Sequence, residues 1–179
     1  VYERWGTFPP SGLLLIGPRG SGKTLLAGAL AARTETPFLH IRCPRLALQV
    51  LHAGGKIGEL LQGWQETLAE INRITVFFDE LDFAHDPSLG APRLDLPTSQ
   101  LSDFLLELID TTIGSMATLI LGSTSRPDTL SPVYFEAGRF ERIVSVIPSV
   151  PGDVIAALLL HAAAAEKRAG RKLFEPVDW

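Results

Sequence analysis

Apolar and polar positions fall into two kinds of block along the chain. Short apolar runs, each four to six residues long, alternate with longer stretches in which apolar residues recur at helical spacing. The runs predict strands at Gly12–Ile16, Pro37–Arg42, Ile74–Phe78, Ala117–Gly122 and Ile143–Ile147. The longer stretches predict helices over about Ser21–Ala32, Glu59–Glu70, Thr98–Asp110 and Asp153–Ala169, with Gly170 as the stop of the last one. This alternation predicts an α/β fold in which a parallel five-stranded sheet is sandwiched by helices.

Two stretches between these elements are predicted to be loops. One follows the second strand and contains Gly54, Gly55 and Gly58. The other, Asp86–Pro97, holds three prolines and a glycine.

Composition narrows the class of protein. With 179 residues, of which 46% are apolar, the chain can bury one substantial core. The net charge of −4 gives no electrostatic case for nucleic acid, because nucleic-acid binders usually carry a basic excess. Cys43 is the only cysteine, which leaves no disulfide framework or thiolate zinc site and fits an intracellular, reducing compartment.

No apolar run reaches the roughly 18 residues that a membrane-spanning helix needs, and the first residues lack the pattern of a signal peptide. The chain starts at Val1 and stops at Trp179 in what reads as the entry to another element. We therefore expect it to be part of a longer protein, whose membrane anchoring stays open.

The octapeptide Gly17–Thr24 stands directly between the first predicted strand and the first predicted helix. It matches the pattern G-x-x-x-x-G-K-[ST] of a loop that cradles phosphates with backbone N–H groups at a helix N-terminus. Lys23 would reach the β- and γ-phosphates, and the Thr24 hydroxyl would ligate Mg²⁺. The residues predicted to bind the nucleotide are Gly17, Pro18, Arg19, Gly20, Ser21, Gly22, Lys23, Thr24 and Leu25.

Asp79 and Glu80 close the buried run at Ile74–Phe78. In a parallel sheet, the carboxyl ends of the strands are where ligands bind. Asp79 would hold Mg²⁺ directly or through water, and Glu80 could orient the attacking water. The competing interpretation is a solvated turn. Asp82 could cap the turn that follows or support the metal ligand.

Other nucleotide-binding classes fit less well. A GTPase would need an [NT]-K-x-D element after a later strand, and the chain has none. A small-molecule kinase would need a lid of arginines, which is not evident. A hydrolytic ATPase is favoured.

Here the chain resembles the AAA clade of the AAA+ ATPases over nearly its whole length. The segment Gly6–Ile16 is similar to the family's approach to its phosphate loop. The segments Gly122–Pro132 and Ala137–Arg142 are similar to its second region of homology, which separates the clade from other phosphate-loop enzymes. The run Gly22–Ala27 and the spacing to Pro37-Phe38 look most like the FtsH-type branch, and the Cdc48-type branch is the alternative.

The resemblance implies a large nucleotide-binding subdomain over residues 1–150, followed over residues 151–179 by a connecting helix and the start of a small helical lid that is mostly missing. It also implies a ring, usually hexameric, that binds ATP with Mg²⁺ between neighbouring subunits and threads polypeptide through a pore. Lys56-Ile57-Gly58-Glu59 occupies the place of the pore loop, where a purely structural loop is the alternative.

Two positions depart from the family pattern. The sensor residue is normally Asn, whereas this chain has Ser125, whose shorter side chain reaches less far toward the γ-phosphate or the attacking water. Members commonly present two arginines to the neighbour's ATP, whereas this chain keeps Arg139 and has Glu136 in place of the first. The resemblance assigns catalytic roles to Glu80, Lys23, Arg139 and Ser125.

Two hypotheses remain. In the first, the chain is an ATPase module of a protein-remodelling or unfolding ring, homomeric or heteromeric. In the second, it is a catalytically weakened, nucleotide-binding structural subunit of a hetero-oligomeric ring. A nucleic-acid-dependent ATPase is a distant third.

Overall fold

The computed structural model describes residues 12–52, 57–71, 73–83, 98–113, 118–148 and 150–175. Five strands form one parallel sheet in the spatial order β2-β3-β4-β1-β5. The strands are β1 (Gly12–Ile16), β2 (Phe38–Arg42), β3 (Ile74–Asp79), β4 (Thr118–Thr124) and β5 (Arg142–Ser145). This sheet confirms the predicted α/β class and the predicted number of strands.

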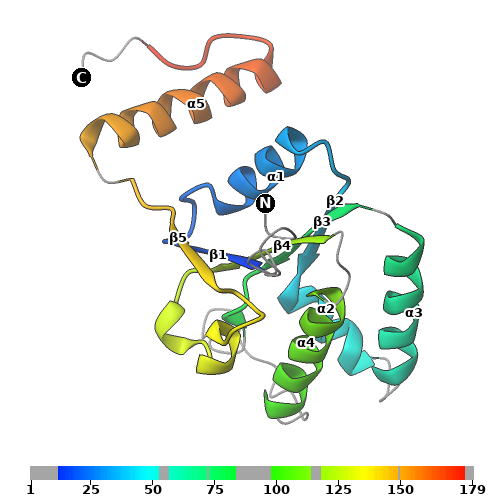
Figure 1. Ribbon diagram of the computed structural model, residues 1–179. Coiled ribbons are helices and arrows are strands. Elements are labelled where there is room, and N and C mark those ends of the chain that lie inside the picture. Colours follow the sequence, from blue (N-terminus) through cyan, green and yellow to red (C-terminus); the bar gives the residue numbers. More distant parts are fainter. Residues whose placement is uncertain are drawn as a thin grey trace, which may run out of the picture. The chain divides into compact units, whose positions relative to one another are not determined.

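Helices cover both faces of the sheet (Figure 1). α1 (Lys23–Arg33) lies on one face, and α2 (Cys43–His52), α3 (Ile57–Glu70) and α4 (Thr98–Ile113) lie on the other. Two short 3-10 helices, Pro127–Thr129 and Pro132–Phe135, connect β4 to β5.

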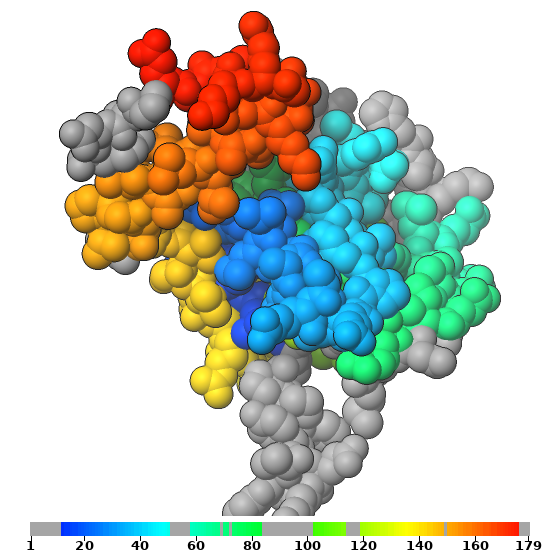
Figure 2. All heavy atoms as spheres, turned by 90° about the horizontal axis from the view of Figure 1, so that it is seen from above, coloured from blue at the N-terminus to red at the C-terminus, as the bar shows by residue number. Residues whose placement is uncertain are grey.

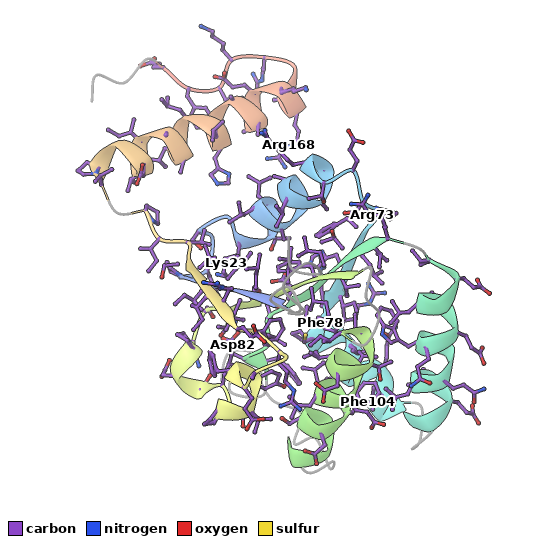
Figure 3. The ribbon with its side chains drawn as sticks, in the orientation of Figure 1. Lys23, Arg73, Phe78, Asp82, Phe104 and Arg168 are labelled. Atoms are coloured by element: carbon purple, nitrogen blue, oxygen red, sulfur yellow. The ribbon has the colours of Figure 1, made fainter. Side chains whose placement is uncertain are left out.

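Alternation along the strands divides the apolar side chains between two clusters. Val76 and Phe78 belong to the larger cluster, to which α2, α3 and α4 also contribute, and Figure 3 shows Phe78 together with Phe104 of α4. Phe77 points to the opposite face, where it packs with Leu15 of β1 and with Ala27 of α1. Because successive side chains of a strand point to opposite faces of the sheet, the position of a residue within its apolar run decides which cluster it joins.

The structure corrects the prediction for the stretch after β2. Residues 43–52 form helix α2, whereas the sequence predicted no helix between the second strand and Glu59. The helix was not predicted because it is short and has a proline, Pro44, near its start. Proline often marks a loop, but it is tolerated in the first turn of a helix. Its buried residues Cys43, Ala47 and Val50 recur at helical spacing, which is the signal that was available.

The predicted pore loop lies partly outside the described residues. Gly54, Gly55 and Lys56 are not described, and the backbone of Ile57, Gly58 and Glu59 already forms the first turn of α3. The expectation of a loop at Ile57 and Gly58 was therefore wrong. The approach segment Gly6–Ser11 and the predicted loop Asp86–Pro97 also lie outside the described residues.

The chain divides into two compact units, Val1–Val146 and Ile147–Trp179. The second contains α5 (Pro151–Ala169), which ends at Gly170 in the left-handed conformation, with a φ of 64°. Glu166 accepts backbone N–H bonds from Leu173 and Phe174, at 3.0 and 3.2 Å, which folds the following segment back on the helix. None of the helices within the described residues is both long enough and apolar enough to cross a bilayer. The subdomain boundary between residues 150 and 151 stays a prediction.

Gly122 lies where the sheet packs most tightly. A Cβ atom there would come within 2.8 Å of Phe140 and 2.9 Å of Leu81, and both of these side chains are buried. Because overpacking a dense core costs about 1–3 kcal/mol, we expect Gly122→Ala to lower the free energy of unfolding by that amount. Urea denaturation measures it. Gly63→Ala on α3 is the matched control, since its Cβ would meet nothing within 4 Å and should leave stability unchanged or raise it.

Candidate functional site: a phosphate loop beside Asp79

The loop Gly17–Gly22 connects β1 to α1 and depends on its glycines at two kinds of position. Gly20 and Gly22 have φ angles of 81° and 93°, a region that glycine enters without the clash of a Cβ. At Gly17 the reason is steric, because a Cβ atom would lie 2.2 Å from the carbonyl oxygen of Val146. Val146, which directly follows β5, also holds the start of the loop in place, since its N–H donates to the carbonyl oxygen of Ile16 at 2.7 Å.

Lys23, the first residue of α1, curls into this loop. Its Nζ donates to the carbonyl oxygens of Gly17 and Pro18, at 2.7 and 2.8 Å, and the residue is only 9% exposed. Burial lowers the pKa of Lys23, and the charges of Asp79, Asp82 and Glu80 oppose this shift. Figure 3 shows Lys23 at the start of α1.

A polar atom of the loop is left over for a ligand. The Ser21 hydroxyl is buried and has no hydrogen-bond partner in the described part of the chain. A buried unpaired hydroxyl is costly, and beside an ammonium group and a helix N-terminus it fits an anion. The donor set therefore fits a phosphate group. Leu25, also predicted to bind nucleotide, is 75% exposed on the outer side of α1, which lies at the surface in Figure 2.

The structure brings the two predicted metal residues together. The Thr24 hydroxyl donates to Oδ2 of Asp79 at 3.0 Å, across 55 positions in the sequence. Within the described ranges, no group of three or more His, Cys, Asp or Glu side chains could hold a metal ion. This sparse oxygen set fits Mg²⁺, which keeps several waters and takes only one or two carboxylates besides the phosphates of its substrate.

Glu80 follows Asp79 in a left-handed conformation, with a φ of 61°. For a residue other than glycine this conformation costs about 1–2 kcal/mol. Ser123 of β4 holds it in place: its hydroxyl accepts the Glu80 N–H at 3.1 Å, and its carbonyl accepts the Leu81 N–H at 2.9 Å. The Glu80 side chain is exposed. The Glu80 side chain therefore faces solvent at the end of β3, while the hydrogen bonds to Ser123 hold its backbone in place.

Ser125, the predicted sensor, lies against another carboxylate. Its hydroxyl donates to Oδ2 of Asp82 at 2.8 Å, and its N–H to Oδ1 at 3.4 Å. Asp82 is 6% exposed. Asp82 thus holds the turn after β4 in place, a role that neither of its predicted alternatives described. The Ser125 hydroxyl already donates its hydrogen to Asp82.

Sequence reasoning missed two residues that contact Asp79. The Ser123 hydroxyl donates to Oδ1 at 2.5 Å, and His40 Nε2 lies 2.8 Å from Oδ2. Ser123 was missed because the fourth strand was predicted to end at Gly122, whereas β4 runs to Thr124. His40 was missed because the four histidines, His40, His52, His85 and His161, form no cluster or metal-binding motif in the sequence. The available signal was its place near the end of a strand, where the carboxyl ends of parallel strands meet.

Arg139 is engaged within its own chain. Its guanidinium forms a two-pronged pair with Asp110, from Nε at 2.7 Å and from Nη2 at 2.8 Å. Nη1 donates to Glu136 at 3.1 Å and to the Val133 carbonyl at 2.9 Å. The hydrogen bonds to Asp110 are the main reason that the pKa of Arg139 is raised. Two carboxylates therefore already neutralise the cation that the resemblance assigns to a neighbouring subunit.

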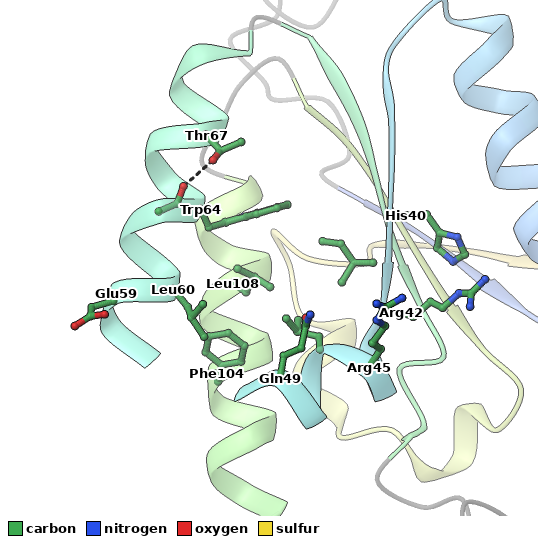
Figure 4. Close-up of a pocket in the computed structure, with 13 residues that line it drawn as sticks. His40, Arg42, Arg45, Gln49, Glu59, Leu60, Trp64, Thr67, Phe104 and Leu108 are labelled. Carbon is green, nitrogen blue, oxygen red and sulfur yellow. Dashed lines mark hydrogen bonds between the residues drawn. The ribbon is translucent and has the colours of Figure 1, made fainter. Parts of the chain in front are cut away.

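A cavity of about 710 Å³ lies apart from the phosphate loop, between β2 and the helices α2, α3 and α4 (Figure 4). Trp64, Phe104 and Leu108 supply apolar wall, and Trp64 Nε1 donates to the Thr112 hydroxyl at 2.9 Å. Arg42 and Arg45 lie on the side of β2 and α2. No residue of Gly17–Leu25 lines this cavity, so it is distinct from the phosphate loop.

Comparison with known proteins agrees with this geometry. The family model for the "ATPase family associated with various cellular activities (AAA)" matches residues 13–147. A proteasome-activating nucleotidase of Methanocella arvoryzae is 36% identical over 153 residues, which cover 82% of this chain and 34% of that protein. Protein CdcH of Halobacterium salinarum is 32% identical over 148 residues, covering 81% of this chain and 19% of that protein. A nuclear valosin-containing protein-like protein of Mus musculus is 34% identical over 146 residues, covering 80% and 17%.

The matched part of the chain thus spans about a third or less of the length of these relatives. The family match covers all five strands except Gly12, the first residue of β1, together with the phosphate loop and Asp79. The chain belongs to the ATPase family associated with various cellular activities, the AAA family.

Proposed function

We propose that this chain binds ATP with Mg²⁺ and hydrolyses it as one subunit of a ring that remodels or unfolds polypeptides. The observation that carries the proposal is the meeting of the phosphate loop with Asp79. Thr24 stands next to Lys23 at the start of α1, and its hydroxyl donates to Asp79 at 3.0 Å. The similarity to a proteasome-activating nucleotidase supports a role connected with protein turnover.

Each residue of the site has a definite task in this proposal. Lys23 would exchange the carbonyls of Gly17 and Pro18 for phosphate oxygens. Thr24 and Asp79 would hold Mg²⁺, which when bound neutralises charge on the phosphates. Glu80 would accept a proton from the attacking water and orient it, which the exposure of its side chain allows.

The proposal is tested in the protein by Mg²⁺-dependent phosphate release and by sedimentation in the presence of ATP. We expect phosphate release that stops with EDTA, and an ATP-dependent oligomer larger than a dimer. A protein that binds no ATP would contradict the nucleotide site. A protein that hydrolyses ATP as a monomer would contradict the ring.

The second candidate is a structural subunit that binds nucleotide but contributes little to catalysis at its neighbour's site. The observation that favours this candidate is that Arg139 forms salt bridges with Asp110 and Glu136 of its own chain. An arginine that serves a neighbouring phosphate can be worth about 10³–10⁵ in rate. To serve in this way, Arg139 would have to leave two carboxylates of its own chain.

Replacing Glu136 by arginine separates the two candidates. Glu136→Arg removes an anion that holds Arg139 and restores a second cation, so we expect ATP turnover of the assembled ring to rise at least about tenfold. Glu70→Arg, an equal charge change on an exposed residue at the end of α3, should leave turnover unchanged. If the unmodified ring already matches the turnover of Glu136→Arg, the interface is not impaired and the structural-subunit candidate is wrong.

A further inference from the structure

His40 lies on the edge strand β2, at the end of the sheet where the phosphate loop lies. In the parallel register of β2 and β3, His40 is opposite Phe77 and Arg42 is opposite Asp79. The His40 side chain reaches diagonally to Asp79, where Nε2 lies 2.8 Å from Oδ2. The contact is sheltered, since the two side chains are 24% and 13% exposed.

Aromatic neighbours hold the imidazole in this orientation. The His40 ring lies 6.1 Å from the Phe38 ring at an interplanar angle of 29°, and 5.3 Å from the Phe77 ring at 32°. Phe38 and Phe77 also stack on each other, with centroids 6.0 Å apart. A ring confined in this way keeps its Nε2 edge toward Asp79.

The polarity of this hydrogen bond follows from its acceptor. An ionised carboxylate only accepts hydrogen bonds, so Nε2 carries the hydrogen. His40 is therefore the donor and Asp79 the acceptor of this contact.

Counting the acceptor sites of Asp79 shows what the bond achieves. A carboxylate offers about four lone-pair sites. Oδ1 accepts from Ser123, and Oδ2 accepts from both Thr24 and His40. About one site is left, and its direction is fixed because the other three are anchored to β4, α1 and β2.

We propose that His40 is a positioning residue for Asp79, whose N–H fixes the carboxylate so that the remaining lone pair serves Mg²⁺ or a water bound to it. This inference rests on the proposed function, since it needs Mg²⁺ at Thr24 and Asp79. His40 itself does not contact the metal. Outer hydrogen bonds of this kind typically change metal affinity by about 10–100-fold.

Two substitutions separate the hydrogen bond from the packing of the ring. His40→Phe keeps an aromatic ring beside Phe38 and Phe77 and deletes the donor. His40→Gln loses the ring and keeps an amide N–H at a similar reach. The measurement is the MgCl₂ concentration at half-maximal tightening of a fluorescent ATP analogue, with binding in EDTA measured alongside.

We expect His40→Phe to raise the half-maximal MgCl₂ concentration at least about tenfold, with binding in EDTA unchanged. His40→Gln should stay within about threefold of the parent protein. The inference is overturned if His40→Phe needs no more MgCl₂ than the parent, or if His40→Gln is impaired as strongly as His40→Phe. Should His40→Phe fail to bind the analogue in EDTA, His40→Leu takes its place in the same comparison.

The EDTA arm keeps this inference distinct from the proposed function. If the parent protein does not bind the analogue in EDTA or in MgCl₂, the phosphate loop is not a nucleotide site and the proposed function fails. If it binds and tightens with MgCl₂ while His40→Phe behaves like the parent, only the role of His40 fails.

Discussion

Replacing Lys23 by methionine should lower the affinity for ATP at least about 100-fold. Its Nζ lies 2.7 and 2.8 Å from two carbonyl oxygens of the loop, a position from which it can be passed to phosphate oxygens. Methionine keeps the stem of the side chain and removes the cation. Each charge-assisted hydrogen bond is worth about 1.5–3 kcal/mol, and two such bonds account for a change of about 100-fold or more.

Calorimetric titration with ATP and Mg²⁺ measures this loss, and Arg33→Met is the control. Arg33 is a cation in the last turn of the same helix, remote from the loop and exposed. We expect its replacement to leave ATP affinity within about twofold, because an exposed charge at the far end of α1 is screened by solvent. An equal loss in both variants would mean that the charge of α1 as a whole, and not the Lys23 contact, holds the nucleotide.

Replacing Glu80 by glutamine should lower the rate of ATP hydrolysis by about 10²–10⁴, because a positioned general base contributes about that much. Glutamine has nearly the same shape and cannot accept the proton. The backbone hydrogen bond from Glu80 to Ser123 does not involve the side chain, so the left-handed turn should survive. ATP affinity should therefore change little while turnover is lost.

The matched control for Glu80→Gln is Glu35→Gln. Glu35 is the other residue besides glycine with a positive φ in the described segments, at 53°, and it is also exposed. The same substitution in the same backbone conformation tests for a general effect, and we expect none on phosphate release. Normal turnover in Glu80→Gln would remove Glu80 from the mechanism.

Each part of the site that the sequence predicted is a short continuous segment of the chain. Lys23 and Thr24 follow the glycines at fixed spacing, and α1 begins at Lys23, within two residues of the predicted start. Asp79 ends a run of five buried residues, which made both the strand and its last position readable. Local geometry dictates such segments, so their chemistry is visible without the fold.

The parts that the sequence did not predict are pairings across distance. Asp110 and Arg139 are 29 positions apart and meet through the packing of α4 against the loop after the second 3-10 helix. Their pairing changes the prediction for Arg139, from a cation offered to a neighbour to one held by its own chain. A motif gives the identity of a residue and says nothing about which carboxylates surround it.

The sequence by itself determined the alternation of strands and helices, the phosphate loop and the carboxylates Asp79 and Glu80, because each depends on residues within a few positions of one another. Only the tertiary structure decided what surrounds Asp79. His40 and Ser123 reach it from 39 and 44 positions away, since the parallel register brings the ends of β2, β3 and β4 together. That register follows from the packing of the whole sheet, which no single segment encodes.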